Sequence, residues 1–184
     1  MADNESETVL TAFQTLRDFE QRSLVHAVGL PEQNLGAGAW TGIAFKLADA
    51  NLVSEIRDTV EILTFPEFTS IPGSQSWVLG MANIRGNLVP IIDLRGYLSG
   101  EKTIIKKNSR VLVVRQQEGS VGLLIDEIVG QRHFNDEELS DDEHFKDHMA
   151  GPFVTREYVK GESHWGAFDA AKLINSSDFM KAAA

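Results

Sequence analysis

The chain has 184 residues, of which 42% are apolar and 24% charged, and this composition is that of an ordinary globular protein of one compact unit. The formal net charge of −10 argues against nucleic acid as a partner, because phosphate binding needs clustered lysine and arginine. The absence of cysteine excludes disulfides, thiolate catalysis and zinc–cysteine sites.

The N-terminal residues 1–8 are acidic and polar and predict a disordered lead. They lack the positively charged and apolar regions of a secretory signal. Apolar runs such as VPII and VGLLI are far shorter than the ~20 residues that a membrane span needs. We therefore expect a cytoplasmic protein with no direct membrane insertion.

Residues 9–30 predict an amphipathic helix, because apolar side chains recur at helical spacing along one stripe. Gly29 and Pro31 end this pattern. We expect the helix to pack against its own domain, as most amphipathic helices do. A role as a partner-binding helix stays open, since Phe19 and Val25 lie outside the stripe.

After a glycine-rich link, short apolar runs alternate with turn residues from Thr41 to Asp126. The runs are TGIAFKL, LVSEI, TVEILTF, WVLGMANI, NLVPIID, RVLVVRQ and SVGLLID. Short strands at this spacing predict a β-barrel or sandwich and not a parallel α/β sheet. The last two runs predict a hairpin whose turn lies at Gln117, Glu118 and Gly119.

The stretch at about 135–148 is densely acidic and predicts a solvated helix face or a loop. A helix there would place His144 and His148 on one face, the spacing used for zinc or nickel. No third ligand is specified, so packing or surface roles are favoured, and a metal-binding enzyme or switch is the weaker alternative. Near the end of the chain, Asp169 is placed to cap the short helix AAKLI.

No catalytic motif is found in the sequence. Phosphate loops, the G-x-S-x-G elbow and H-E-x-x-H are absent. Asp126 and Glu127 are adjacent on a strand and would face opposite sides, which does not suit paired acid–base work. The sequence therefore predicts neither an enzyme nor a bound cofactor.

The stretch GMANIRGNLVPIIDLRGYL predicts two strands, Trp77–Ile84 and Leu88–Ile92, joined by a tight turn in which Gly86 takes a positive φ. Pro90 cannot donate to a ladder, so the second strand is expected to be an edge strand or bulged. Asp93 is placed to cap the turn of helix LRGYL. Arg85 at the hairpin tip is either a solvated turn residue, which physics alone favours, or a protein-docking residue.

The same stretch resembles the signature of the CheW-like domain family, which runs roughly G-x-x-N-x-R-G-x-x-x-P-x-x-D-L. The matching positions that shape the motif are Gly80, Asn83, Gly86, Pro90 and Asp93. The run TVEIL upstream and the run RVLVVRQQEGSVGLLIDEI downstream are also similar to the family. The segments TLRDFEQRSLVHAVGLP, AWTGIAF and RHF are more similar to the PilI-type subgroup, which serves type IV pili and twitching motility.

The resemblance implies a mostly β fold with two packed five-stranded SH3-like barrels over residues 31–184, an N-terminal amphipathic helix and a short C-terminal helix. The stretch HWGAFDAAKLI departs from the family, so we expect the last barrel strand to be short. The implied function is a non-enzymatic adaptor between the tip of a chemoreceptor's cytoplasmic hairpin and the regulatory domain of a CheA-like histidine kinase. Such an adaptor would be recruited to inner-membrane receptor arrays, with the cell pole as one location. A coupling protein of flagellar chemotaxis is the alternative.

The resemblance also implies a receptor-coupling surface. Its members by position are Thr59, Glu61, Arg85 and Ile128. The family's kinase contact lies on the first barrel, but no short motif assigns its residues in this sequence.

Overall fold

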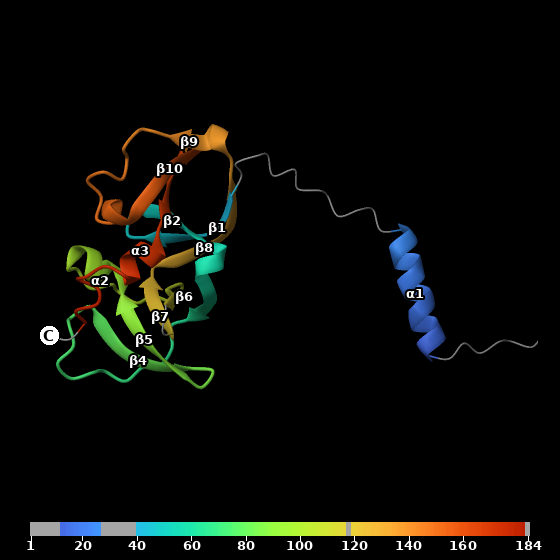
Figure 1. Ribbon diagram of the computed structural model, residues 1–184, viewed down its shortest axis with the longest axis horizontal. Coiled ribbons are helices and arrows are strands. Elements are labelled where there is room, and N and C mark those ends of the chain that lie inside the picture. The colour runs from blue at the N-terminus through green and yellow to red at the C-terminus, as the bar shows by residue number, and fades with distance from the viewer. Residues whose placement is uncertain (1–11, 27–39, 117–118, 183–184) are drawn as a thin grey trace, which may run out of the picture. The chain divides into compact units, whose positions relative to one another are not determined.

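The computed structural model describes residues 12–26, 40–116 and 119–182 (Figure 1). Two compact units, Met1–Asn34 and Leu35–Ala184, are described separately. The first contains helix α1 (Ala12–His26), on which Phe13, Leu16 and Phe19 are exposed. The predicted lead at 1–8 and both ends of the predicted helix at 9–30 lie outside the described residues. That α1 packs on its own domain stays a prediction.

The second unit contains two β-sheets. The six-stranded sheet has the order β8-β1-β2-β11-β10-β9. Its strands are β1 (Trp40–Leu47), β2 (Ala50–Glu55), β8 (Glu127–Phe134), β9 (Leu139–Ser140), β10 (Val154–Lys160) and β11 (Ser163–Phe168). The five-stranded sheet has the order β3-β6-β7-β5-β4. Its strands are β3 (Thr59–Thr64), β4 (Val78–Ile84), β5 (Asn87–Asp93), β6 (Arg110–Gln116) and β7 (Gly119–Ile125).

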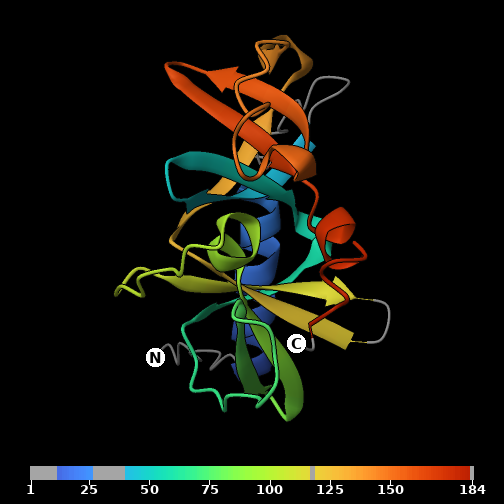
Figure 2. The same cartoon turned by 90° about the vertical axis from the view of Figure 1, so that its left-hand side faces the viewer.

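Short helical segments connect the strands. They are α2 (Leu94–Ser99), α3 (Ala170–Ile174) and the 3₁₀ turns η1 (Ile56–Asp58), η2 (Asp136–Glu138) and η3 (Gly151–Phe153). Helices α2 and α3 lie between the two sheets (Figures 1 and 2). The side chains of Asp93 and Asp169 accept hydrogen bonds from Gly96 N and Lys172 N, which confirms both predicted helix caps.

The two sheets share one plan. In each sheet a hairpin (β4–β5 or β10–β11) pairs in parallel with a strand of a second hairpin (β6–β7 or β1–β2). A fifth strand, β3 or β8, then pairs with that second hairpin. The six-stranded sheet adds only the two-residue β9 beside β10, where the other sheet has a single bridge from Thr69 to Met81. The predicted fold class, mostly β with paired SH3-like halves, is confirmed.

Three apolar clusters hold this unit together. A shared core combines both sheets with α2 and α3 and includes Phe45, Leu112 and Leu173. Each sheet also has an inner core of its own, around Val111 and Val113 in the five-stranded sheet and around Tyr158 in the six-stranded sheet. Burial of apolar area at ~25 cal/mol per Å² makes these clusters the main source of stability.

Two expectations about strands are wrong. Strand β5 is not an edge strand, because it lies between β4 and β7. Pro90 pairs with Met81 on β4, and the parallel ladder with β7 begins one residue later, at Ile91, so the missing N–H costs no ladder bond there. The register shift lies in the partner strand, between Val78 and Gly80.

The last strand is also not short. β11 spans six residues and pairs along its length with β10. The buried side chains of Trp165 and Phe168 supply the apolar contacts of this strand. The aromatic residues therefore replace the aliphatic run that the family pattern led us to expect.

Candidate functional site

The turn between β4 and β5 presents Arg85. Arg85 has a φ of 52° and Gly86 a φ of 87°, so both turn residues are left-handed, as in a type I′ hairpin. Asn83 Oδ1 accepts a hydrogen bond from Gly86 N at 2.8 Å. The predicted turn and the positive φ of Gly86 are confirmed, and the two-residue connection holds Arg85 in one position.

The Arg85 side chain forms an ion pair with Glu61 on β3. Arg85 Nη2 donates to Glu61 Oε1 at 2.6 Å, and the side chains are 79% and 21% exposed. Strands β3 and β4 are the two ends of the sheet order, so this pair joins the ends of the five-stranded sheet. Arg85 is therefore a positioned cation and not a freely solvated turn residue.

An opening of about 560 Å³ lies beside this ion pair. Its lining combines the charged pair with apolar side chains, among them Val60, Ile84, Leu88 and Val89. Leu88 is 71% exposed although it lies within a strand. An arginine beside exposed aliphatic groups suits the docking of a protein segment that carries both apolar and acidic side chains.

Of the four predicted coupling residues, Glu61 and Arg85 form the ion pair, whereas Thr59 and Ile128 lie toward the shared core. Glu61 lies opposite Val113 of the inner core, whereas Thr59 lies opposite Val114 of the shared core. Opposite residues of an antiparallel pair have their side chains on one face, so Thr59 and Glu61 face different cores across the register shift of β3. Ile128 lies in the other sheet, on β8, and packs against the shared core. Their role toward a receptor stays a prediction.

Asp93 organises the end of β5. Its side chain is buried, and its carboxylate accepts from Gly96 N at 3.0 Å, from Thr103 N at 2.8 Å and from Thr103 Oγ1 at 2.6 Å. Sequence reasoning missed Thr103, because no local signal links it to a residue ten positions earlier. Gly80 is required for another reason: a Cβ there would collide with the Thr69 backbone.

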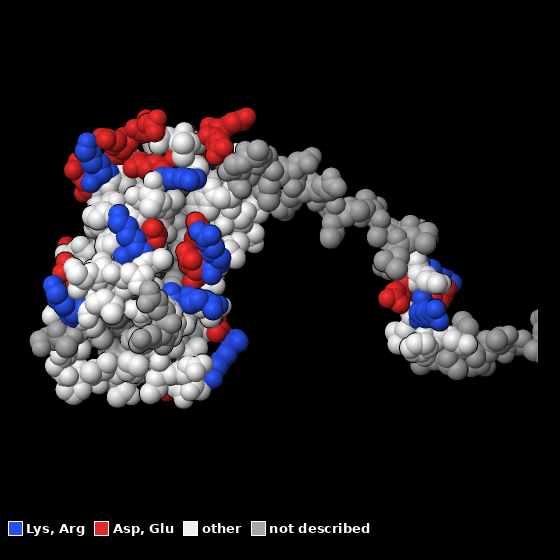
Figure 3. All heavy atoms as spheres, in the orientation of Figure 1, with Lys and Arg blue, Asp and Glu red and all other residues white. Residues whose placement is uncertain are grey.

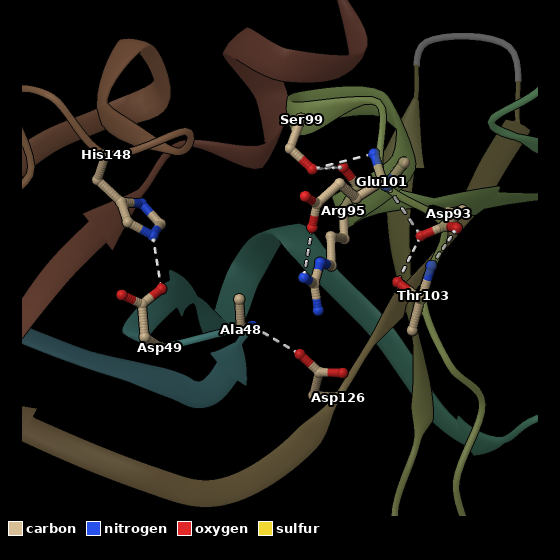
Figure 4. Close-up of polar contacts among 10 residues, drawn as sticks. Ala48, Asp49, Asp93, Arg95, Ser99, Glu101, Thr103, Asp126 and His148 are labelled. Carbon is tan, nitrogen blue, oxygen red and sulfur yellow. Dashed lines mark hydrogen bonds and ion pairs between the residues drawn. The ribbon is translucent and has the colours of Figure 1, made fainter.

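A second polar cluster lies near the β1–β2 turn (Figure 4). Arg95 Nη2 donates to Glu101 at 2.7 Å, and Ala48 N donates to Asp126 at 2.6 Å. The pKa of Arg95 is raised, first by the hydrogen bond to Glu101 and also by the charges of Asp126 and Asp93. These contacts fix the side chains of Arg95 and Asp126, which suits a structural role at this position of the fold.

The two histidines of the acidic segment have different partners. Residues 141–150 form turns and not a helix. The His144 ring stacks on His164 with centroids 4.3 Å apart, while His148 Nε2 lies 3.3 Å from Asp49 Oδ1. The turns agree with the loop alternative for this acidic stretch, and the two imidazoles do not share a helix face. Among the described residues, no group of three His, Asp or Glu could hold a metal ion.

The pKa of Asp49 is lowered, by a backbone hydrogen bond first and by the contact with His148 next. His148 Nδ1 in turn accepts from Ala150 N at 3.1 Å. This histidine therefore connects two turns.

None of the helices described here has the length and apolar character needed to cross a membrane.

Comparison with known proteins identifies the family. The family model of the CheW-like domain matches residues 41–178. Protein PilI of Pseudomonas aeruginosa is 35% identical over 175 residues, which cover 95% of this chain and 98% of that protein. Chemotaxis protein CheW of Klebsiella aerogenes is 25% identical over 136 residues, which cover 74% of this chain and 82% of that protein.

A solved structure has the same fold. The scaffolding protein TtCheW from Thermoanaerobacter tengcongensis aligns with a TM-score of 0.63 at 21% identity, covering 75% of this chain and 94% of that one. The resemblance seen in the sequence is thus confirmed by family, relative and fold. This chain belongs to the CheW-like domain family.

Proposed function

We propose that this chain is a non-enzymatic adaptor that couples a chemoreceptor of the methyl-accepting type to a CheA-like histidine kinase. The match to the CheW-like domain over residues 41–178 is the observation that carries the proposal. Adaptors need two separate binding surfaces and no reacting groups. The two sheets, each with its own inner core, would offer such surfaces on one compact unit.

The receptor would bind at the opening beside Glu61 and Arg85. Aliphatic side chains of a helical hairpin tip would contact Leu88 and Val60, while an acidic side chain would pair with Arg85. The two-residue turn keeps Arg85 in place before binding, so little ordering entropy is lost. Thr59, on the same sheet, and Ile128, on the other sheet, would border the same partner.

The kinase would bind through its regulatory domain, which in this family is homologous to the adaptor. Coupling then follows from linkage: a receptor state changes kinase activity only if the two states differ in contact energy with the adaptor. Because one molecule holds both partners, a shift at one surface biases the other. No enzymatic step is required of this chain.

The pathway we favour controls type IV pili and twitching motility. The similarity to PilI over nearly its whole length supports this pathway. The alternative is a flagellar chemotaxis system. It is supported by the similarity, at lower identity, to chemotaxis protein CheW. Deleting the gene in its native cell should abolish twitching and leave swimming unchanged, and the opposite phenotype would transfer the protein to the flagellar pathway.

Binding of a receptor cytoplasmic fragment tests the adaptor directly. We expect Arg85→Glu to weaken binding at least tenfold, about 1.4 kcal/mol, without lowering the melting temperature. The matched control is Lys181→Glu, which reverses a charge that is likewise exposed and ion-paired, with Asp178, and that does not line the opening. Equal binding by wild type and Arg85→Glu would remove Arg85 from the receptor surface. A pull-down from native extract that contains neither a receptor nor a histidine kinase would refute the adaptor itself.

The same proposal places the protein in the cytoplasm at receptor arrays. A fluorescent fusion in native cells should form clusters at the inner membrane, with the pole as the expected site. Clusters should disperse in a strain without the receptors. A uniformly diffuse signal in wild-type cells would contradict recruitment.

A further inference from the structure

An opening of about 470 Å³ lies at one end of the inner core of the six-stranded sheet. Residues two positions apart on a strand share a face, which places charged side chains beside this core. On β2, Glu55 follows the core residue Val53, and on β10, Arg156 precedes the core residue Tyr158. All four line the opening. Its volume is in the range of about 300–1,000 Å³ that is usual for small-molecule sites.

The lining of the opening includes a buried hydroxyl without a partner. Tyr158 is 1% exposed, and among the described residues nothing forms a hydrogen bond with its Oη. Trp40 lies beside it, with ring centroids 5.7 Å apart, and in the same part of the chain its buried Nε1 also has no acceptor. Buried polar groups are normally paired, so two unpaired groups on neighbouring rings point to a missing acceptor.

Both rings are held in place. Trp40 stacks on Phe134 with centroids 5.6 Å apart, and the Tyr158 ring lies 4.9 Å from the same phenyl ring. A Cβ at Gly42 would lie 2.8 Å from the indole ring, so only glycine leaves room for Trp40 across β1. The two polar groups are therefore positioned before any ligand arrives, which lowers the entropy cost of binding.

One cation and one anion of the lining are not paired with each other or with a neighbour. Arg57 forms an ion pair with Glu55. Within the described ranges, neither Arg156 nor Asp58 takes part in an ion pair. The pKa of Arg156 is raised, first by the Tyr158 hydroxyl, so the guanidinium lies near that hydroxyl although not in good hydrogen-bonding geometry. The opening thus offers separate positions for a negative and a positive group.

The surroundings of the opening are acidic. Figure 3 shows acidic side chains gathered at the end of the unit where β9 and β10 are labelled in Figure 1. Asp169 also lines the opening, but its Oδ1 accepts from Lys172 N at 2.7 Å and caps α3. A phosphate or a dicarboxylate would be repelled by this field, whereas a ligand without net charge would not. The charges therefore favour a zwitterion.

We propose that this opening binds a free α-amino acid. The carboxylate of the ligand would accept hydrogen bonds from Tyr158 Oη and Trp40 Nε1 and pair with Arg156, and its ammonium group would pair with Asp58. The ligand's side chain would lie against the apolar part of the lining, which includes Val53. The inference does not depend on the proposed function.

Nuclear magnetic resonance of the nitrogen-15-labelled full chain tests the proposal. The indole N–H signal of Trp40 is assigned by its loss in Trp40→Phe. Each common amino acid is added at up to about 10 mM, which covers dissociation constants of about 1 mM and below. We expect at least one of them to shift the Trp40 signal in a saturable way and to leave that of Trp77, in the other sheet, unchanged. No shift with any of them overturns the proposal.

Two variants separate binding from folding. Tyr158→Phe keeps the ring and removes only the unpaired hydroxyl, so it should weaken binding at least tenfold, about 1.4 kcal/mol, without lowering the melting temperature. Arg156→Gln should weaken binding by a similar factor. The matched control Lys160→Gln removes a charge from the same strand outside the opening and should bind as wild type. Unchanged binding by both Tyr158→Phe and Arg156→Gln would overturn the site.

The chemistry of the ligand is tested with two derivatives of the amino acid that binds best. Its amide lacks the carboxylate that would face Arg156, and its N-acetyl form lacks the ammonium group that would face Asp58. Both should bind at least tenfold more weakly. In Asp58→Asn the loss caused by N-acetylation should shrink, because the group that recognises the ammonium is gone. An N-acetyl form that binds the wild type as tightly as the free amino acid would overturn the assignment to amino acids.

Discussion

The five-stranded and six-stranded sheets repeat one arrangement with different surface chemistry. In each, a two-residue turn follows the hairpin strand, and a basic residue at that end pairs with a glutamate: Arg85 with Glu61, and Lys160 with Glu138 at 2.9 Å. The first pair borders an opening lined in part by aliphatic side chains, and the second joins β10 to η2, whose three residues are all acidic. Similar backbones therefore carry different side-chain chemistry at corresponding strand ends.

The helix caps also differ between the two halves. Asp93 and Asp169 each cap a helix directly after a hairpin strand, but Asp93 is buried and also binds Thr103. We expect Asp93→Ala to lower the free energy of unfolding by about 3–5 kcal/mol, since it leaves one buried donor, Gly96 N, and two partly buried donors of Thr103 without their acceptor. Asp169→Ala should cost about 1 kcal/mol, the usual value of a cap. Urea unfolding measures both losses. Equal values would show that the contacts of Asp93 with Thr103 add nothing to its role as a helix cap.

Two glycines of the β4–β5 hairpin are needed for different reasons. Gly80→Ala should cost about 2–4 kcal/mol, because its Cβ would collide with the backbone of Thr69. Gly86→Ala should cost about 1–2 kcal/mol, because only its left-handed φ is unfavourable and its surroundings are open. Thermal unfolding measures both. A larger loss for Gly86 would mean that the turn, and not the strand contact, limits stability.

The two ion pairs provide a functional comparison of matched variants. Glu61→Gln and Glu138→Gln should each change stability by less than about 1 kcal/mol, because the cations of both pairs are open to solvent. Binding of the receptor fragment should fall only for Glu61→Gln, since Arg85 loses the group that orients it. Isothermal titration calorimetry gives the affinities. Equal binding by both variants would make the Glu61–Arg85 pair a purely structural contact.

The smallest expected effect concerns acid stability at the contact of Asp49 with His148. The pKa of Asp49 is lowered in the folded chain, so its stabilisation is present above the unfolded value and is lost as pH falls through the folded value. Asp49→Asn should therefore lose less stability between about pH 5 and pH 3 than wild type. The difference should stay below about 1 kcal/mol, because the side chain is 89% exposed and screened. Urea unfolding across this pH range measures it, and identical pH profiles would show that His148 does not stabilise the carboxylate.

Local patterns predicted local structure well. The strands from Trp40 to Ile125, the turn at Gly86 and the caps at Asp93 and Asp169 all follow from residues that are neighbours in sequence. Contacts between distant segments were not predictable from pattern. The pairing of Glu61 with Arg85 depends on how the sheet brings its two ends together, and the resemblance to a family named both residues without showing that they touch.

The failed expectations have similar causes. Pro90 suggested an edge strand, but β5 has a parallel neighbour, β7, which is distant in the sequence. The pairing of β5 with β7 begins at Ile91, after the proline. The acidic stretch allowed a helix face or a loop, and turns form around His144 and His148, where Glu157 of β10 binds the backbone N–H groups of His144 and Phe145. In both cases tertiary contacts decided what the local sequence left open.

The order of the strands along the chain has a mechanical consequence. The five-stranded sheet is a continuous insertion between β2 and β8 of the other sheet, entered through η1 and left through the single residue Asp126. With a three-residue entry and a one-residue exit, the two sheets have almost no slack between them. The shared core packs both sheets against each other as well. A partner that displaces the inserted sheet would therefore act on the enclosing sheet through these two crossings and the shared core.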